Sequence, residues 1–221
     1  MPAASPVIAI DGPSASGKGT VAQGVAGALR FHYLNSGALY RTVALAAARL
    51  GSERESALTL ANIALNLQAH FSGDHVLFDG RDVTDAIRAE EIGALASRIA
   101  EMQPVRQALL DRQRAFRQPP GLVADGRDMG TVVFPDAPLK FFLTASAEVR
   151  AERRYKQLIN KGVDVSLRTL LLDIQARDER DTNRPVAPLV PAKDAILIDT
   201  SRMGADAVFA LVLREVGKAF N

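Results

Sequence analysis

The sequence predicts an α/β fold in which a five-stranded parallel sheet is covered by helices on both faces. Short apolar runs alternate along the chain with long segments of helical periodicity, which is typical of parallel sheets that are buried on both sides. The first apolar run, Val7–Ile10, leads into a glycine-bearing turn over Gly12–Thr20, which opens a helical stretch. This order of strand, turn and helix is typical of a phosphate-binding loop.

The predicted elements follow one another over a single domain of residues 1–221. Strands are runs rich in Val, Ile, Leu and Phe, and helices repeat apolar residues every three or four positions. The five strands are expected at Val7–Ile10, Phe31–Leu34, Leu122–Ala124, Leu139–Leu143 and Ala195–Ile198. The helices are expected at Thr20–Leu29, Ala38–Leu50, Ala86–Phe116, Ala147–Lys161, Leu167–Asp181 and Ala205–Ala219.

One segment departs from this alternation. Residues His70–Val83 alternate between apolar and polar, with turn signals at Gly73–Asp74 and Asp79–Gly80. Such a pattern is typical of a small antiparallel hairpin. We therefore expect an inserted subdomain over residues 61–99, mounted on the main sheet.

Composition excludes several classes of function. The chain has 48% hydrophobic residues, a net charge of +2 and no cysteine, so it has no disulfide, no thiol nucleophile and no thiolate metal site. No stretch approaches the roughly 20 apolar residues of a membrane helix. We expect a cytoplasmic monomer with neither nucleic acid nor membrane as a partner.

The 27 basic residues comprise 21 arginines and 6 lysines. Arginine binds phosphate through planar, two-pronged hydrogen bonding, whereas lysine is the usual solubilising charge. The excess of arginine indicates several phosphate contacts, with a genomic bias toward arginine as the alternative.

The turn after the first strand predicts the site of a nucleoside triphosphate. Backbone N–H groups of such a loop converge on an anion, the following helix points its positive end at the same place, and the lysine adds a charge for the β- and γ-phosphates. A glycine-rich turn with an incidental lysine is the alternative. The predicted loop residues are Gly12, Pro13, Ser14, Ala15, Ser16, Gly17, Lys18, Gly19 and Thr20.

Ligands of open parallel sheets bind beyond the carboxyl ends of the strands, so those ends are candidate binding residues. The second strand is followed by Ser36 and Arg41, and Ser36 has helix capping as an alternative role. The third strand ends in Asp125, Arg127 and Asp128, for which a structural ion-pair network is the alternative.

A helical stripe carries further charge. Arg177, Asp181 and Arg184 have the spacing i, i+4 and i+7 that places them on one helix face, and Pro185 predicts that the helix ends at Arg184. A solvated charged face is the alternative.

The helix after the fourth strand carries Arg150, Arg153 and Arg154. These arginines are candidates for a mobile flap over the triphosphate. The alternative is that they pair with neighbouring acids such as Glu148 and Glu152.

Several motifs occur together in one order along the whole chain. They are Ile10–Ser14 with Gly17–Thr20, Asn35–Arg41, Ala124–Thr131, Arg177–Asp178 with Asn183–Arg184, Ala187–Leu189, and Asp199–Ser201. This set resembles the bacterial cytidylate kinase family, and the Gly-Lys-Gly-Thr form of the loop resembles nucleoside monophosphate kinases rather than switch GTPases. Asn35 stands where the family usually has Asp, and Ala15 or Ser16 where it usually has Gly.

The resemblance implies the nucleoside monophosphate kinase fold, with residues 61–99 binding the acceptor and a short arginine-bearing lid at residues 150–164. It implies transfer of the γ-phosphoryl group of ATP, with Mg²⁺, to CMP or dCMP. A kinase for another small acceptor, such as UMP or AMP, and a non-catalytic ATP-binding module are the alternatives.

The resemblance also implies roles for individual residues. Charge on the transferred group would be neutralised by Lys18, Arg153 and Arg154, and Thr20 would contact Mg²⁺ directly or through water. The acceptor phosphate would be held by Ser36, Arg41 and Arg127, with Arg184 bridging toward it. The cytosine edge would be read by Ser97, Arg106 and Asp128, and the sugar hydroxyls would be bound by Arg177 and Asp181.

Overall fold

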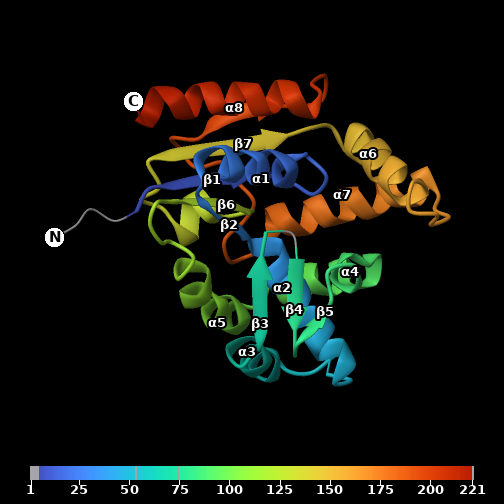
Figure 1. The fold of residues 1–221 in the computed structure, drawn as a ribbon. Helices are drawn as coiled ribbons and strands as arrows, with labels where there is room; N and C mark the ends of the chain where they lie inside the picture. Colours follow the sequence, from blue (N-terminus) through green and yellow to red (C-terminus); the bar gives the residue numbers. More distant parts are fainter. Residues whose placement is uncertain (1–4, 53, 74, 221) are drawn as a thin grey trace.

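The computed structural model describes residues 5–52, 54–73 and 75–220. Its main layer is a five-stranded sheet with the order β2-β6-β1-β7-β8, in which every pairing is parallel (Figure 1). The strands are β1 (Val7–Asp11), β2 (His32–Asn35), β6 (Leu122–Gly126), β7 (Leu139–Thr144) and β8 (Ile196–Asp199). The predicted fold class is confirmed.

Helices cover both faces of this sheet because its central strands are apolar on both sides. On one face, Ile8 and Ile10 pack against α1 (Lys18–Leu29) and α8 (Ala205–Phe220). On the other face, Val7 and Ala9 pack against a π-helical turn, η2 (Met129–Val133), and against the start of α2 (Ser36–Arg49). The sheet is therefore a buried layer, and its carboxyl edge is the part left open for a ligand.

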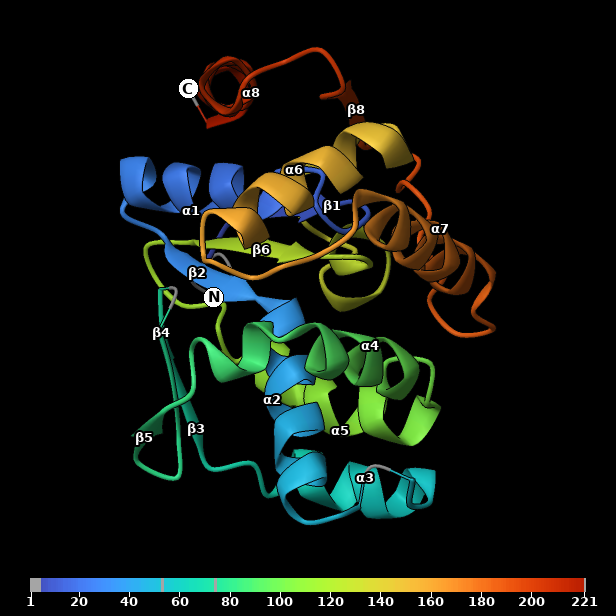
Figure 2. The same cartoon turned by 90° about the vertical axis from the view of Figure 1, so that its right-hand side faces the viewer.

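A second unit lies beside the sheet, and the two ribbon views agree on this placement (Figure 2). Its apolar core joins residues of α2 to those of most of the other elements in the unit. These are α3 (Ala57–Leu65), β3 (Ala69–Ser72), β4 (His75–Phe78), β5 (Arg81–Asp82), η1 (Ala86–Arg88), α4 (Glu90–Ile99) and α5 (Gln103–Arg114).

The structure corrects two expectations for this unit. The expected hairpin is a three-stranded antiparallel sheet, because β5 adds to β4 through the register Phe78 with Arg81. The expected helix over residues 86–116 is divided into η1, α4 and α5. Pro104 lies in the first turn of α5, where a missing N–H is tolerated, but in a continuous helix it would clash with the carbonyl of Ala100. The expected subdomain boundary at residue 61 lies within α3.

Two helices flank the open edge of the sheet. Helix α6 (Ala147–Ile159) follows β7 and packs against α7 (Leu167–Asn183), which also contacts α4. Helix α7 ends at Asn183, and Arg184 is extended before Pro185, as predicted. Within the described part of the chain, none of the helices has the length and hydropathy required to span a bilayer.

Candidate active site

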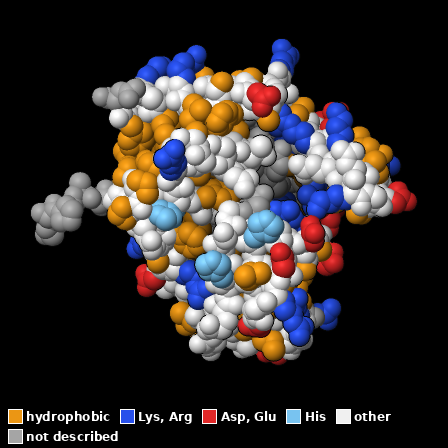
Figure 3. Space-filling model, viewed as in Figure 1, with side chains coloured by type: hydrophobic (Ala, Val, Ile, Leu, Met, Phe, Trp, Pro, Cys, Tyr) orange, Lys and Arg blue, Asp and Glu red, His pale blue; other side chains and the backbone are white. Residues whose placement is uncertain are grey.

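A cavity of about 1190 Å³ lies between the carboxyl edge of the sheet and the second unit. In the space-filling view, Lys and Arg side chains gather at the hollow between the two halves of the molecule (Figure 3). All of the predicted substrate-binding residues line this cavity, together with two further predicted catalytic residues, although they come from many separate elements and loops. They are Lys18, Ser36, Arg41, Ser97, Arg106, Arg127, Asp128, Arg154, Arg177, Asp181 and Arg184.

The phosphate loop enters the cavity from the end of β1. Ser14, Ala15, Lys18 and Gly19 line the cavity, whereas Gly12, Pro13, Ser16 and Gly17 do not. At Gly12, where φ is +152°, a side chain would overlap the carbonyl group of Leu143 on the neighbouring strand, so glycine lets the loop lie against β7.

Ala15 is the loop residue at which the missing glycine has a structural consequence. Its φ of 57° is in the left-handed region, which costs a residue with a Cβ about 1–2 kcal/mol. Ser16, the other candidate for this departure, is not among the residues of positive φ within the described chain. The loop thus adopts a glycine-like conformation at Ala15 in spite of its side chain.

Lys18 is the cation of the loop. Its Nζ donates a hydrogen bond to the carbonyl of Pro13 at 3.0 Å and lies 4.0 Å from Oδ1 of Asp125. Burial, followed by the positive charge of Arg127, lowers the pKa of Lys18, and Asp125 only partly opposes this. An anion bound in the cavity would therefore stabilise the charged form of Lys18.

Asp125 belongs to the charged cluster that the sequence places at the end of the third strand, although the family resemblance implies no particular role for it. It lies at the end of β6 beside the loop, because the parallel register pairs it with Ile10 of β1. Its Oδ2 accepts a hydrogen bond from the hydroxyl of Tyr33 at 3.3 Å, and a Cβ on Gly19 would lie 3.2 Å from the same oxygen. The strand-end position that makes Asp125 a candidate in the sequence thus places it beside the loop in the structure.

Thr20, the predicted contact to Mg²⁺, is exposed and does not line the cavity. The loop residue that faces Asp125 is Gly19, one position earlier. The structure therefore does not bring Thr20 together with the other predicted residues of the donor site.

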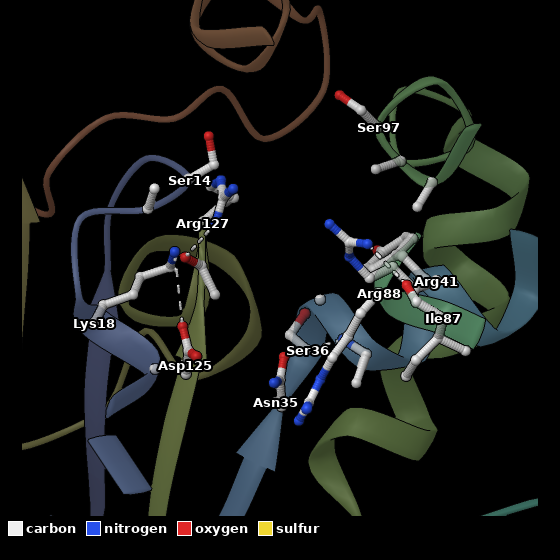
Figure 4. A pocket seen from close by; sticks show the side chains of 18 of the residues that line it. Ser14, Lys18, Asn35, Ser36, Arg41, Ile87, Arg88, Ser97, Asp125 and Arg127 are labelled. Carbon is white, nitrogen blue, oxygen red and sulfur yellow. Dashed lines mark hydrogen bonds and ion pairs between the residues drawn. The ribbon is translucent and has the colours of Figure 1, made fainter. Parts of the chain in front are cut away.

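The start of α2 forms the floor of the cavity, between Lys18 on one side and Arg41 on the other (Figure 4). Asn35, rather than Ser36, caps this helix: its Oδ1 accepts a hydrogen bond from the backbone N–H of Ala38 at 3.0 Å. Asn caps helices as well as Asp does, so the departure from the family pattern keeps this function without a charge. The hydroxyl of Ser36 remains free of the capping role and accepts a hydrogen bond from Gln113 instead.

Two arginines approach the cavity from opposite sides. The guanidinium of Arg41 donates to the backbone carbonyls of Ile87 at 2.8 Å and Ala89 at 3.4 Å, and burial lowers its pKa to about 10. Arg127 Nε donates to Oδ2 of Asp181 at 2.9 Å. Arg41 therefore keeps its positive charge at neutral pH, and the side chains of both arginines line the cavity.

Asp181 connects the second unit with the helix α7. It accepts hydrogen bonds from Arg127 and, at 3.5 Å, from the hydroxyl of Ser97 on α4, and Arg177 lies 3.9 Å away. Burial alone would raise the pKa of Asp181, but the charges of Arg127 and Arg177 outweigh it and lower the pKa. The carboxylate is therefore ionised, and the alternative of a solvated charged face is wrong for this buried residue.

Asp128 is a second buried carboxylate that arginines surround. It pairs with Arg106 of α5, and Nη2 of Arg184 lies 3.8 Å from its other oxygen. That Nη2 atom is buried and has no hydrogen-bond partner among the described residues, which leaves it available to an incoming ligand. Arg184 is otherwise held by a hydrogen bond from its Nε to the carbonyl of Ala187.

The three arginines of α6 have three different surroundings. Arg153 does not line the cavity: it donates to the hydroxyl of Thr200 at 3.0 Å, to the carbonyl of Thr200 at 2.6 Å and to the carbonyl of Ser16 in the phosphate loop at 3.4 Å. Arg154 lines the cavity and donates to Glu90 of α4 at 2.8 Å. Arg150 is buried and pairs with Asp178 of α7 at 2.9 Å. Neither Glu148 nor Glu152 is the partner of these ion pairs in the described residues.

The convergence of Arg41, Arg127 and Arg184 with Lys18 on one cavity is the central feature of this geometry. Each cation comes from a different segment, and each is buried or partly buried. Burial and mutual repulsion both disfavour the charged forms of such a cluster, which Asp125, Asp128 and Asp181 offset only in part, so a bound anion would stabilise it further. The positions of the arginines therefore favour phosphate binding over a plain compositional bias.

Comparison with known proteins agrees with this geometry. A family model described as cytidylate kinase matches residues 8–218. Among curated proteins, the chain is 61% identical to a cytidylate kinase of Cupriavidus necator, with 94% of this chain and 93% of the relative covered. It is 58% identical to a cytidylate kinase of Bordetella bronchiseptica, covering 95% and 94%. It is 54% identical to one of Pseudomonas aeruginosa, covering 97% and 96%.

Proposed function

We propose, because the chain belongs to the cytidylate kinase family of ATP-dependent nucleoside monophosphate kinases, that it transfers the γ-phosphoryl group of ATP to CMP or dCMP. The products are ADP and either CDP or dCDP. The observation that carries the proposal is the single cavity that joins the phosphate loop at Lys18 to Ser36, Arg41 and Arg127.

The reaction requires little covalent participation by the protein. An anionic oxygen of the acceptor phosphate forms a bond to the γ-phosphorus, and the bond from that phosphorus to the bridging oxygen breaks, leaving its electron pair on ADP. Catalysis therefore consists of alignment and of stabilising spread negative charge. Buried cations that converge from separate segments supply both.

The donor nucleotide is assigned to the phosphate loop. The hydroxyls of Ser14 and Ser16 are buried and have no hydrogen-bond partner among the described residues, so they are available beside Lys18. The side chains beside the loop also fit a magnesium ion that would enter together with the triphosphate. Asp125 offers carboxylate oxygen next to the loop, and Mg²⁺ prefers oxygen ligands. When bound, the ion neutralises charge on the phosphates.

The acceptor nucleotide is assigned to the opposite side of the cavity. Ser36, Arg41 and Arg127 hold its phosphate, and Arg184 bridges toward it through Nη2, which makes no hydrogen bond within the described residues. The cytosine edge lies at Ser97, Arg106 and Asp128, and the sugar hydroxyls lie at Arg177 and Asp181. Contacts such as that of Asp181 with Ser97 would then be exchanged for contacts with the nucleotide.

We assign the lid to residues 150–164 and the acceptor-binding subdomain to residues 61–99. The ion pair of Arg154 with Glu90 joins α6 to α4, so it connects these two segments across the cavity. Their closure on both substrates would exclude water, which would otherwise hydrolyse ATP. Arg153 is hydrogen-bonded to Thr200, so we assign it to holding α6 in place rather than to neutralising charge on the transferred phosphoryl group.

Measurement of ADP release with a panel of monophosphates tests the proposal. We expect turnover with CMP and dCMP, and we expect kcat/KM with UMP to be lower by up to about 10⁴-fold, since buried polar groups would be left unpaired. Comparable rates with CMP and UMP would remove the assignment of the base-reading residues. Binding of ATP without ADP release for any monophosphate would indicate a non-catalytic module.

A further inference from the structure

We infer that Gln113 is a positioning residue that orients the hydroxyl of Ser36 toward the phosphate of the acceptor nucleotide; this inference rests on the proposed function. Gln113 Nε2 donates a hydrogen bond to Oγ of Ser36 at 2.8 Å. The two residues lie 77 positions apart in the sequence. Gln113 itself does not line the cavity but lies behind Ser36.

Burial makes this contact specific. The exposed fraction of Gln113 is 2% and that of Ser36 is 4%, so neither side chain can exchange its partner for bulk water. The long amide side chain of Gln113 loses rotamer freedom when it is buried, and this loss of entropy needs a compensating interaction. Within residues 5–52, 54–73 and 75–220, the structure shows no other hydrogen bond to the Ser36 hydroxyl.

The direction of this hydrogen bond determines what Ser36 can do. A serine hydroxyl has one hydrogen to donate and two lone pairs that accept. Because the amide of Gln113 occupies a lone pair from behind, the hydrogen of the hydroxyl is left for an acceptor in the cavity. A phosphate oxygen is such an acceptor, and the start of α2 adds the favourable end of the helix dipole.

The position of Gln113 on α5 supports the same reading. Arg106, which contacts Asp128, lies seven residues earlier and therefore on the same face of the helix. Seven residues of helix span about 10 Å, which is a suitable separation for the two ends of one nucleotide. Helix α5 would thus support the base end through Arg106 and the phosphate end through Gln113.

The test compares Gln113→Met with wild-type protein by calorimetric titration of CMP and of cytidine, which lacks the phosphate. We expect the dissociation constant for CMP to rise about tenfold, as for loss of one well-oriented hydrogen bond, while that for cytidine changes less than about twofold. In a Ser36→Ala background, the same substitution should change CMP binding by less than about twofold, because the group that it orients is gone.

Two further variants keep the test decisive. Gln113→Glu retains the shape of the side chain but accepts the hydroxyl hydrogen instead of donating, so it should weaken CMP binding more than Gln113→Met does. Gln107→Met, at an exposed position of the same helix, is the control and should leave binding unchanged. Thermal unfolding of each variant separates loss of fold from loss of orientation.

The outcomes distinguish the two proposals. Equal losses of CMP and cytidine binding, or an undiminished effect in the Ser36→Ala background, would assign Gln113 to packing alone and overturn the inference. Wild-type protein that fails to bind CMP would instead overturn the proposed function.

Discussion

Replacement of Gly12 by alanine tests whether the loop conformation depends on the contact between β1 and β7. A Cβ at this position would overlap the carbonyl oxygen of Leu143 and lie 3.0 Å from its carbonyl carbon. Both partners are backbone atoms of a buried sheet, so a side-chain rotation cannot relieve the overlap. The substitution must therefore move the loop or separate the strands.

The magnitude follows from two contributions. A residue with a Cβ at positive φ costs of order 1–3 kcal/mol, and displacement of packed backbone typically adds another 1–3 kcal/mol. We expect Gly12→Ala to lower the free energy of unfolding by about 2–6 kcal/mol. Because a shift of about 1 Å in positioning groups can reduce turnover about 10²-fold, we expect kcat/KM for ATP to fall by at least that factor.

The assay is urea unfolding followed by circular dichroism, combined with ADP release at saturating CMP. Gly51→Ala is the matched control, because Gly51 also has a positive φ of +63° but a Cβ there would meet no atom within 4 Å. It should cost only about 1–2 kcal/mol and leave turnover near that of the wild-type protein. Equal destabilisation by the two substitutions would refute the role assigned to the Leu143 contact.

Three other predictions concern charged groups. Lys18→Ala should reduce kcat by about 10²–10³, as for loss of one preorganised stabilising group, and a near-normal kcat in steady-state assays would contradict its role. Asp181→Ala should raise KM for CMP more than KM for ATP, whereas equal changes would indicate a structural role. Asp11 is buried against two backbone N–H groups, and desolvation raises its pKa from 3.8 to about 7. Because the pKa of Asp11 is higher in the folded than in the unfolded state, the protonated group stabilises the fold, and this contribution is lost as pH rises. The free energy of unfolding, measured relative to Asp11→Asn, should therefore fall by up to about 1.4 kcal/mol per pH unit between pH 4 and pH 7. A difference in the free energy of unfolding between wild-type and Asp11→Asn protein that does not change over that pH range would exclude this titration.

Local patterns determined the parts of this protein that depend on neighbouring residues. The alternation of apolar strands with helical stretches predicts the parallel sheet, and the loop from Gly12 to Lys18 predicts one end of the cavity. Pro185 predicts the end of α7, because a residue before proline disfavours helix. The i, i+4 spacing of Arg177 and Asp181 likewise places them on a common face of α7, and both line the cavity. Arg184 also lines the cavity, but it lies beyond the end of the helix, so the predicted spacing does not explain its position.

Partners that are distant in the sequence were decided only by the tertiary structure. Nothing in the sequence around Arg153 indicates Thr200, which lies 47 positions away, yet the guanidinium is held there rather than over the cavity. The choice of Asn35 over Ser36 as the cap follows from the exact end of β2, and the bond of Gln113 to Ser36 follows from the packing of α5. A side chain's direction depends on every element that surrounds it, whereas periodicity and loop motifs act within a few residues; the chain alone therefore determined which residues could meet, and folding determined which of them do.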